Sequence, residues 1–318
     1  MWRKSLYALL VAFVVSPLVG LAPARALTVA PVKYEFEVAA GDTVTGSIRL
    51  INEGSATETF YMEVSDFKSG DTSGSPQFIE PGLSNRSMAA WVKFSQSSVI
   101  LQPGGFANVN FTVSVPASAS PGGYYAGVLA GTVAPTTSGN SVGAVAKTGS
   151  LLLVTVSGAS IERATLTGFS SSAASGASLP VDFTATLQNS GTVHLKPAGV
   201  IRITNMWGGT SAVIPVNEDG GNVLPDSART FTASWSKADL DEDSSELAKE
   251  WKNFGFGPYT ATLIMNYGDA NQVVSATTSF WVMPWMMVVL FIILLVVAAL
   301  LVVQYNKWVV TQAMSKRR

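Results

Sequence analysis

Hydrophobic and polar residues alternate along most of the chain between residues 27 and 280. The alternation is clearest in the runs 44–51, 59–64, 107–115 and 181–187, and clusters of Gly, Pro, Asn and Ser separate such runs. A period of two residues is typical of a strand that has one face in a core and the other in water. Short strands with turn residues between them at this spacing predict β-sandwiches.

Short motifs in the first half of this region recur in the same order in the second half. Residues 50–54 and 187–191 both read L-x-N-x-G at the end of an alternating run, where glycine tolerates a positive φ. Two more pairs follow in the same order: Leu-Gln-Pro at 101–103 with Leu-Pro at 224–225, and G-x-Y at 122–124 with G-x-Y at 257–259. We therefore predict a mostly β protein with two tandem immunoglobulin-like β-sandwich domains, residues 27–158 and 159–280.

The N-terminal segment predicts export. Residues 1–26 combine Arg3 and Lys4 with an apolar run and with the small residues Ala24 and Ala26. These are the features of a cleavable signal peptide, and an uncleaved N-terminal anchor is the alternative.

The C-terminal segment predicts a single membrane helix. Residues 281–303 include no charged side chain, and as a helix they would rise about 34 Å, against a hydrocarbon core of about 30 Å. Four basic residues follow: Lys307, Lys316, Arg317 and Arg318. The positive-inside rule then predicts a cytoplasmic tail, residues 304–318, and an ectodomain outside the cytoplasm. Because the tail is too short for a folded domain, we expect the function to lie outside.

Composition excludes several kinds of chemistry. The net charge is −1, and no basic cluster is interleaved with aromatic residues, so nucleic-acid binding is not expected. The chain has no cysteine and one histidine, His194, which argues against a zinc site. His194 follows a turn, and no G-x-S-x-G motif lies near it, so a structural role is favoured over a catalytic triad. We predict no catalytic residue, no metal, no cofactor and no enzymatic activity.

One short helix is predicted within the second domain, at about residues 244–254. Residues 243–246 resemble a capping box, and Leu247, Trp251 and Phe254 fall on one apolar face, which we expect to dock against the second sandwich.

Acidic residues around this helix have the spacing of a calcium loop: Asp239, Asp241, Asp243 and Glu250. Ser244, however, stands where such a loop requires glycine. The helix dipole and the N-cap explain acidic residues at a helix start, so we interpret them as helix-start residues rather than as metal ligands.

Two further kinds of residue are candidates for carbohydrate chemistry. A glycosidase needs two facing carboxylates, and no spacing singles out a pair among Glu35, Glu63, Asp66 and Glu80. Exposed tryptophans stack on sugars, but the alternating context around three of them favours core positions. These are Trp91, Trp207 and Trp235.

Four segments of the first domain resemble the WxL-interacting proteins of Gram-positive surfaces. They are residues 41–52, 101–105, 109–115 and 121–128, the last reading P-G-G-Y-Y-A-G-V. The resemblance implies a signal peptide, two immunoglobulin-like domains, one membrane helix and a basic tail. It also implies that the first domain binds peptidoglycan and that the second holds a surface-protein partner. No individual ligand residue follows from it.

Three functions remain open at this stage. The leading hypothesis is a membrane-anchored binding protein that tethers cell-wall polymer or surface proteins to the envelope. The alternative is a chaperone-like accessory that lends a sheet edge to another surface protein, since the strand ending at residues 101–103 is similar to a strand of pilus chaperones. An enzyme acting on wall polysaccharide ranks last. The loop 135–142 is either a binding tip or a plain hairpin.

Overall fold

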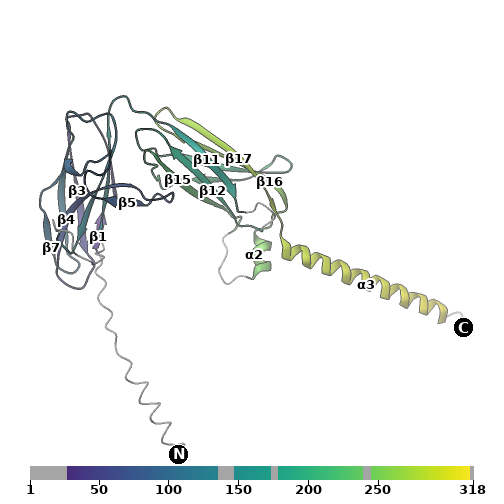
Figure 1. The fold of residues 1–318 in the computed structure, drawn as a ribbon. Coiled ribbons are helices and arrows are strands. Elements are labelled where there is room, and N and C mark those ends of the chain that lie inside the picture. The colour runs from purple at the N-terminus through teal and green to yellow at the C-terminus, as the bar shows by residue number, and fades with distance from the viewer. Residues whose placement is uncertain (1–26, 135–146, 173–177, 239–244, 316–318) are drawn as a thin grey trace, which may run out of the picture. The chain divides into compact units, whose positions relative to one another are not determined.

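The computed structural model describes the chain except for residues 1–26, 135–146, 173–177, 239–244 and 316–318 (Figure 1). The predicted signal peptide, the loop 135–142 and the three aspartates Asp239, Asp241 and Asp243 therefore lie outside the described residues. The predicted fold class is confirmed: the chain is mostly β, with sandwich-like pairs of sheets and one C-terminal apolar helix.

The chain divides into two compact units. The first comprises Met1–Phe67, Phe78–Ser120 and Tyr124–Val156. The second comprises Lys68–Gln77, Pro121–Gly123 and Ser157–Arg318. We call the sandwich formed by β1 to β10 the first sandwich, although the end of β4 and the starts of β5 and β9 fall within the second unit, and the one formed by β11 to β17 the second sandwich.

The first sandwich consists of two sheets. One has the order β1-β3-β8-β6; the other has the order β2-β10-β9-β4-β5, with β7 also paired to β4. Strand β2 pairs with β10 in parallel, whereas the pairings of β1 with β3, β3 with β8, β6 with β8, β4 with β7 and β4 with β9 are antiparallel. The strands are β1 (Leu27–Ala30), β2 (Lys33–Val38), β3 (Thr43–Asn52), β4 (Glu58–Ser69), β5 (Pro76–Ile79), β6 (Val92–Phe94), β7 (Ser98–Leu101), β8 (Phe106–Ser114), β9 (Gly122–Gly131) and β10 (Thr148–Val156). A 3-10 turn, η1 (Ala89–Trp91), precedes β6.

Alternating residues of β3 and β8 supply the centre of the first core. Ile48 and Leu50 of β3 and Val109, Phe111 and Val113 of β8 are buried, while their neighbours face outward. Strand β9 differs because nearly all of its residues are buried. Its apolar sequence is what a central strand that is covered on both faces requires.

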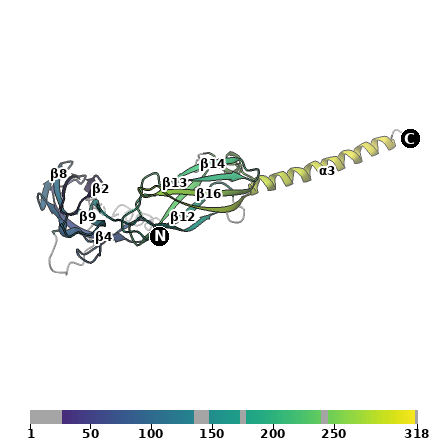
Figure 2. The ribbon, with the colours of Figure 1, turned by 90° about the horizontal axis from the view of Figure 1, so that it is seen from above.

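The second sandwich also has two sheets, with orders β11-β12-β15 and β14-β13-β16-β17. Figure 2 labels β12 of the first of these sheets and β13, β14 and β16 of the second. Strand β12 follows the predicted alternation: Val181, Phe183, Ala185 and Leu187 are buried, and the residues between them are exposed or half-buried. The strands are β11 (Ala164–Ser171), β12 (Val181–Asn189), β13 (Ala198–Asn205), β14 (Thr210–Val216), β15 (Ser227–Trp235), β16 (Gly257–Tyr267) and β17 (Gln272–Val282).

The membrane-helix candidate is α3 (Trp285–Ser315), which starts almost directly after β17. The sequence predicted a helix from residue 281, but Trp281 and Val282 belong to β17, where they pair with Pro258 and Gly257. The helix begins only after Pro284, whose carbonyl accepts a hydrogen bond from the Val288 N–H. Proline fits the start of a helix because the first N–H groups have no partner there.

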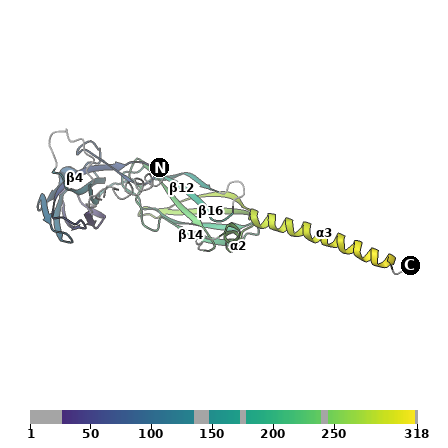
Figure 3. The same cartoon turned by 90° about the horizontal axis from the view of Figure 1, so that it is seen from below.

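The short helix α2 (Glu246–Lys252) corrects the prediction for this segment. Ser245, not Asp243, is its N-cap, with the Ser245 hydroxyl accepting from the Ala248 N–H at 3.3 Å. Leu247 and Trp251 are exposed instead of docking against the sandwich. The buried residues of this segment are Glu250 and Asn253. Helix α2 lies beside the start of α3 (Figure 3).

Candidate functional site

The recurrent L-x-N-x-G motif has a structural cause in the first sandwich. Asn52 is buried, and its side-chain amide donates to the carbonyls of Ala56 at 2.8 Å and Leu101 at 3.0 Å. The Asn52 Oδ1 accepts from the Gly54 N–H at 2.9 Å. One side chain thus joins the end of β3, the turn that follows it and the end of β7.

The second sandwich repeats this arrangement. The buried amide of Asn189 donates to the carbonyls of Val193 at 2.8 Å and Val223 at 2.9 Å, and its Oδ1 accepts from the Gly191 N–H at 2.8 Å. Val223 stands directly before Leu224-Pro225, just as Leu101 stands before Gln102-Pro103. The motifs therefore mark equivalent structural positions in the two sandwiches, not a ligand site.

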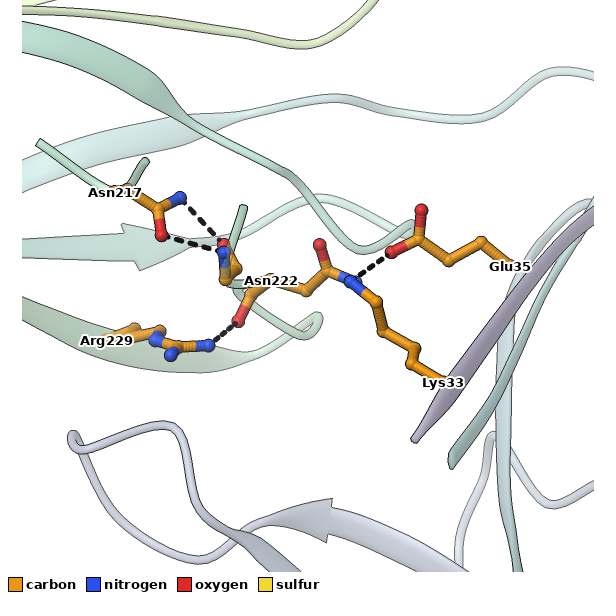
Figure 4. A network of polar contacts seen from close by, with 6 residues as sticks. Lys33, Glu35, Asn217, Asn222 and Arg229 are labelled. Atoms are coloured by element: carbon orange, nitrogen blue, oxygen red, sulfur yellow. Dashed lines mark hydrogen bonds and ion pairs between the residues drawn. The ribbon is translucent and has the colours of Figure 1, made fainter. Parts of the chain in front are cut away.

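The loop that carries Val223 is held by side-chain hydrogen bonds (Figure 4). Asn217, which has a φ of 61°, donates to the Gly221 carbonyl at 2.9 Å and accepts from the Gly221 N–H at 2.7 Å. Arg229 of β15 donates to the Asn222 carbonyl at 3.0 Å. These contacts fix the loop that the Asn189 amide binds.

Asp66 is a buried residue that holds a loop in place. Its carboxylate is fully buried and accepts from three backbone N–H groups: Gly82 at 2.7 Å, Met88 at 3.1 Å and Ala89 at 3.0 Å. It therefore fixes the chain after β5 to the start of η1. A carboxylate with three backbone donors has its acceptor sites occupied, which suits a structural role.

Glu35 lies too far from the carboxylates of β4 to form a catalytic pair with them. Glu63 binds the Lys147 ammonium at 2.6 Å, Glu35 binds the Lys33 ammonium at 2.7 Å, and Glu80 is exposed. Strands β2 and β4 lie three positions apart in their sheet, or about 14 Å at ~4.8 Å per strand. Glycosidase carboxylates lie about 5–9.5 Å apart. The enzyme hypothesis gains no support here.

In the described part of the chain, no group of three or more His, Asp or Glu residues is placed to bind a metal ion. His194 is half-buried beside the bridge between Leu195 and Val223. The Ser73 hydroxyl and N–H bind the Asp71 carboxylate and lower its pKa, but Asp71 is an exposed turn residue.

The three candidate tryptophans have different positions. Trp235 is 2% exposed and lies in the second core, as predicted. Trp91 is half-buried, packs against the first core and contacts Tyr124, with ring centroids 4.5 Å apart. The prediction for Trp207 is wrong, because this side chain is 82% exposed in the turn between β13 and β14.

One edge of the first sandwich is both exposed and uncharged. Strands β7 (SVIL) and β5 (PQFI) pair with β4 and contain no charged residue. Ile100 of β7 is 72% exposed, and Phe78 of β5 is also exposed. We call this the β7–β5 edge. The sequence predicted no such edge, and its available sign was the uncharged S-V-I-L run.

The opposite edge of the same sheet is protected by charge. Strand β2 carries Lys33, Glu35 and Glu37, and Lys33 pairs with Glu35 (Figure 4). Charged side chains on an edge strand hinder the addition of another strand. The contrast makes the β7–β5 edge the more suitable edge for binding an extended polypeptide.

No protein-family model and no curated protein sequence matches the chain. Solved structures that it resembles include the class 5 fimbriae chaperone CfaA, with 11% identity, a TM-score of 0.38 and coverage of 80% of this chain and 99% of that one. Another is the E. coli chaperone DraB, with 10% identity, a TM-score of 0.35 and coverage of 80% and 96%. Likeness at this level says nothing about what this chain binds.

Proposed function

We propose that the chain is a single-pass membrane protein without enzymatic activity, whose two sandwiches lie outside the cytoplasm and bind another surface polypeptide. The observation that carries this proposal is α3. Its segment Trp285–Val309 is 25 residues long, and an 18-residue window within it has a mean hydropathy of 3.5 and no buried residue. An exposed apolar helix of this length is stable in a bilayer and unfavourable in water.

The β7–β5 edge supports the choice of a polypeptide as the partner. An unpaired strand edge offers a row of backbone donors and acceptors, which an extended peptide satisfies by adding a strand. Ile100 would give such a peptide an apolar contact beside the backbone bonds. This role corresponds to that of an accessory in the assembly of surface proteins.

Crosslinking from the edge tests the proposal. A photo-crosslinking amino acid replaces Ile100 in the full chain, in its native membrane. Val213 of β14 is the matched control, because it is also an aliphatic strand residue and is 53% exposed. We expect an adduct from position 100 whose added mass is a polypeptide, identified by mass spectrometry, and no adduct from position 213. Ile100→Lys should abolish partner capture by the otherwise unmodified chain, because a lysine on the edge opposes strand addition.

Two results would contradict this proposal. Equal adducts, or none, at positions 100 and 213 would exclude the β7–β5 edge as the binding site. An adduct whose added mass is removed by wall hydrolases would instead favour the tethering of peptidoglycan, the function that the resemblance to WxL-interacting proteins implies.

A further inference from the structure

The strand register defines which elements lie at the α3 end of the second sandwich. Strand β17 finishes at Val282, which pairs with Gly257 at the beginning of β16. Asn205, the last residue of β13, pairs with Tyr259 on the other side of β16. The turn between β13 and β14 therefore lies at the same end of the sandwich as the start of α3. The turn between β16 and β17 lies at the opposite end.

Exposed aromatic side chains gather at the α3 end. Trp207 lies in the turn between β13 and β14, and Trp251 on α2 is 71% exposed. Phe254 and Phe256 follow α2, and Trp281 stands next to the last residue of β17. We call these five residues the aromatic collar. The turn at the opposite end reads Gly-Asp-Ala-Asn and has no aromatic residue.

Helix α2 is held at the level of the first turns of α3. The buried Glu250 carboxylate accepts a hydrogen bond from the Met287 N–H at 3.1 Å. Met287 lies in the first turn of α3, where an N–H has no partner within the helix and where the helix dipole favours a negative charge.

An apolar groove of about 540 Å³ separates the two helices. Leu247 and Trp251 line it on the α2 side, and Leu290, Phe291 and Leu294 line it on the α3 side. From Trp285 to Leu294, α3 rises about 14 Å. The apolar stretch of α3 before Gln304, residues 285–303, would rise about 28 Å, close to the roughly 30 Å hydrocarbon core, so its first turns lie at one boundary of that core.

We propose that the α3 end of the second sandwich is seated in the outer interface of the bilayer. In this position, α2 and the aromatic collar lie at the level of the lipid headgroups. A lipid acyl chain fills the groove between α2 and α3. The inference rests on the membrane anchoring proposed above. It adds how deeply the α3 end of the second sandwich reaches into the bilayer. Tryptophan prefers this interface because its ring is apolar while its N–H stays hydrated.

The exposure of the α2 face is the reason for preferring a lipid to the sandwich as its cover. A soluble protein would bury Leu247 and Trp251, yet both are exposed although a β-sheet surface lies within the same unit. Because α2 is bonded to the first turn of α3, a bilayer that surrounds α3 must also reach α2. The apolar face of α2 then satisfies the pattern of an interfacial helix.

The absence of cysteine makes a depth measurement direct. The full chain is placed in lipid nanodiscs with a single nitroxide-labelled cysteine, introduced by Trp251→Cys, Ala270→Cys or Leu295→Cys. Ala270 lies in the turn at the far end of the sandwich, and Leu295 lies within the apolar stretch of α3. Collisions with oxygen, which dissolves in lipid, are compared with collisions with a water-soluble nickel complex.

We expect collisions with oxygen to dominate at position 295, collisions with the nickel complex to dominate at position 270, and the ratio of the two at position 251 to lie between these values. If position 251 behaves like position 270 while position 295 remains in lipid, α2 does not lie in the interface, although α3 still spans the membrane. If position 295 also behaves like position 270, the anchor itself fails. The three labels thus separate the failure of this inference from the failure of the proposed function.

A second measurement addresses the occupant of the groove. Ala248, which lines the groove, is replaced by cysteine and labelled with bimane in the full chain. We expect lipids brominated near the headgroup end of the acyl chain to quench this fluorophore more strongly than one at position 270. Equal quenching at both positions, or quenching relieved as the number of chains per nanodisc rises, would show that a lipid does not fill the groove. The second result would identify another copy of the chain.

Discussion

An asparagine side chain offers two N–H donors and one carbonyl acceptor, and Asn52 and Asn189 use all of these in the same way. Each amide binds one carbonyl four residues ahead and a second one at the end of a distant segment. Buried polar groups that lose their partners cost more than the hydrogen bond itself contributes. The L-x-N-x-G motif therefore recurs in both sandwiches because each needs an asparagine to bind the same backbone groups.

Replacing either asparagine should loosen its own sandwich. We expect Asn52→Ala and Asn189→Ala each to reduce the free energy of unfolding by about 2–4 kcal/mol, since both leave buried backbone groups without partners. Hydrogen exchange with mass spectrometry on the full chain should show faster exchange in β3 for the first variant and in β12 for the second.

Matched controls stand one position further along in each motif. Glu53 and Ser190 are exposed, so Glu53→Ala and Ser190→Ala should change the stability by no more than about 0.5 kcal/mol. If an asparagine variant exchanges no faster than its control, the amide is not what fixes the turn.

Residue-level predictions succeeded where the local pattern determined the environment. Trp235 ends a strand with clear alternation, and it is buried. Trp207 was placed in the core on the same kind of pattern, but the chain turns at Asn205, where the Asn205 Oδ1 accepts from the N–H groups of Trp207 and Gly209. The Trp-Gly-Gly sequence was the available sign of a turn, since glycine allows such a bend.

At the scale of the elements, α2 shows why a helical pattern does not identify its partner. The spacing of Leu247 and Trp251 correctly marks one apolar face, but Phe254 lies beyond the end of the helix. Sequence periodicity cannot tell whether that face meets a sheet, another helix or a lipid. What decides its surroundings is Glu250, whose bond to Met287 joins segments that lie 37 residues apart in the sequence.

This bond can be tested with two substitutions. Glu250→Gln keeps an acceptor at the Met287 N–H and should leave α2 in place. Glu250→Leu removes the acceptor and should free α2 from α3, because an uncapped first turn loses about 0.5–2 kcal/mol. A nitroxide at position 248 should become more mobile in the leucine variant only. Equal mobility in both variants would mean that the carboxylate does not hold the two helices together.

The element order of the sandwiches was easier to predict than their edges. Alternation and turn residues located the strands, because each strand buries one face in its own core. The β7–β5 edge depends on which strands become neighbours, and pairing between distant strands leaves no local pattern. The helix from residue 281 was predicted too early for a related reason: Trp281 and Val282 are apolar enough for either a strand or a membrane helix.

At the scale of the whole molecule, the proposed orientation makes a prediction for intact cells. A membrane-impermeant maleimide should label Ala270→Cys without any treatment, because the sandwich would be displayed outside. Gln312→Cys, near the end of α3, should react only after the membrane is made permeable. Labelling of position 312 in intact cells would reverse the orientation derived from the basic tail.

The direct passage from β17 into α3 also has a mechanical consequence. Strand β11 starts near the far end of the second sandwich, where the Ala164 carbonyl accepts from the Tyr267 hydroxyl, and β17 leaves at the α3 end. Tension between Ala164 and the bilayer would therefore run along β17, parallel to the strand. All the hydrogen bonds that pair β17 with β16, from Gln272 to Val282, would resist it in shear together instead of opening one after another. Such an attachment withstands pulling on the anchored chain.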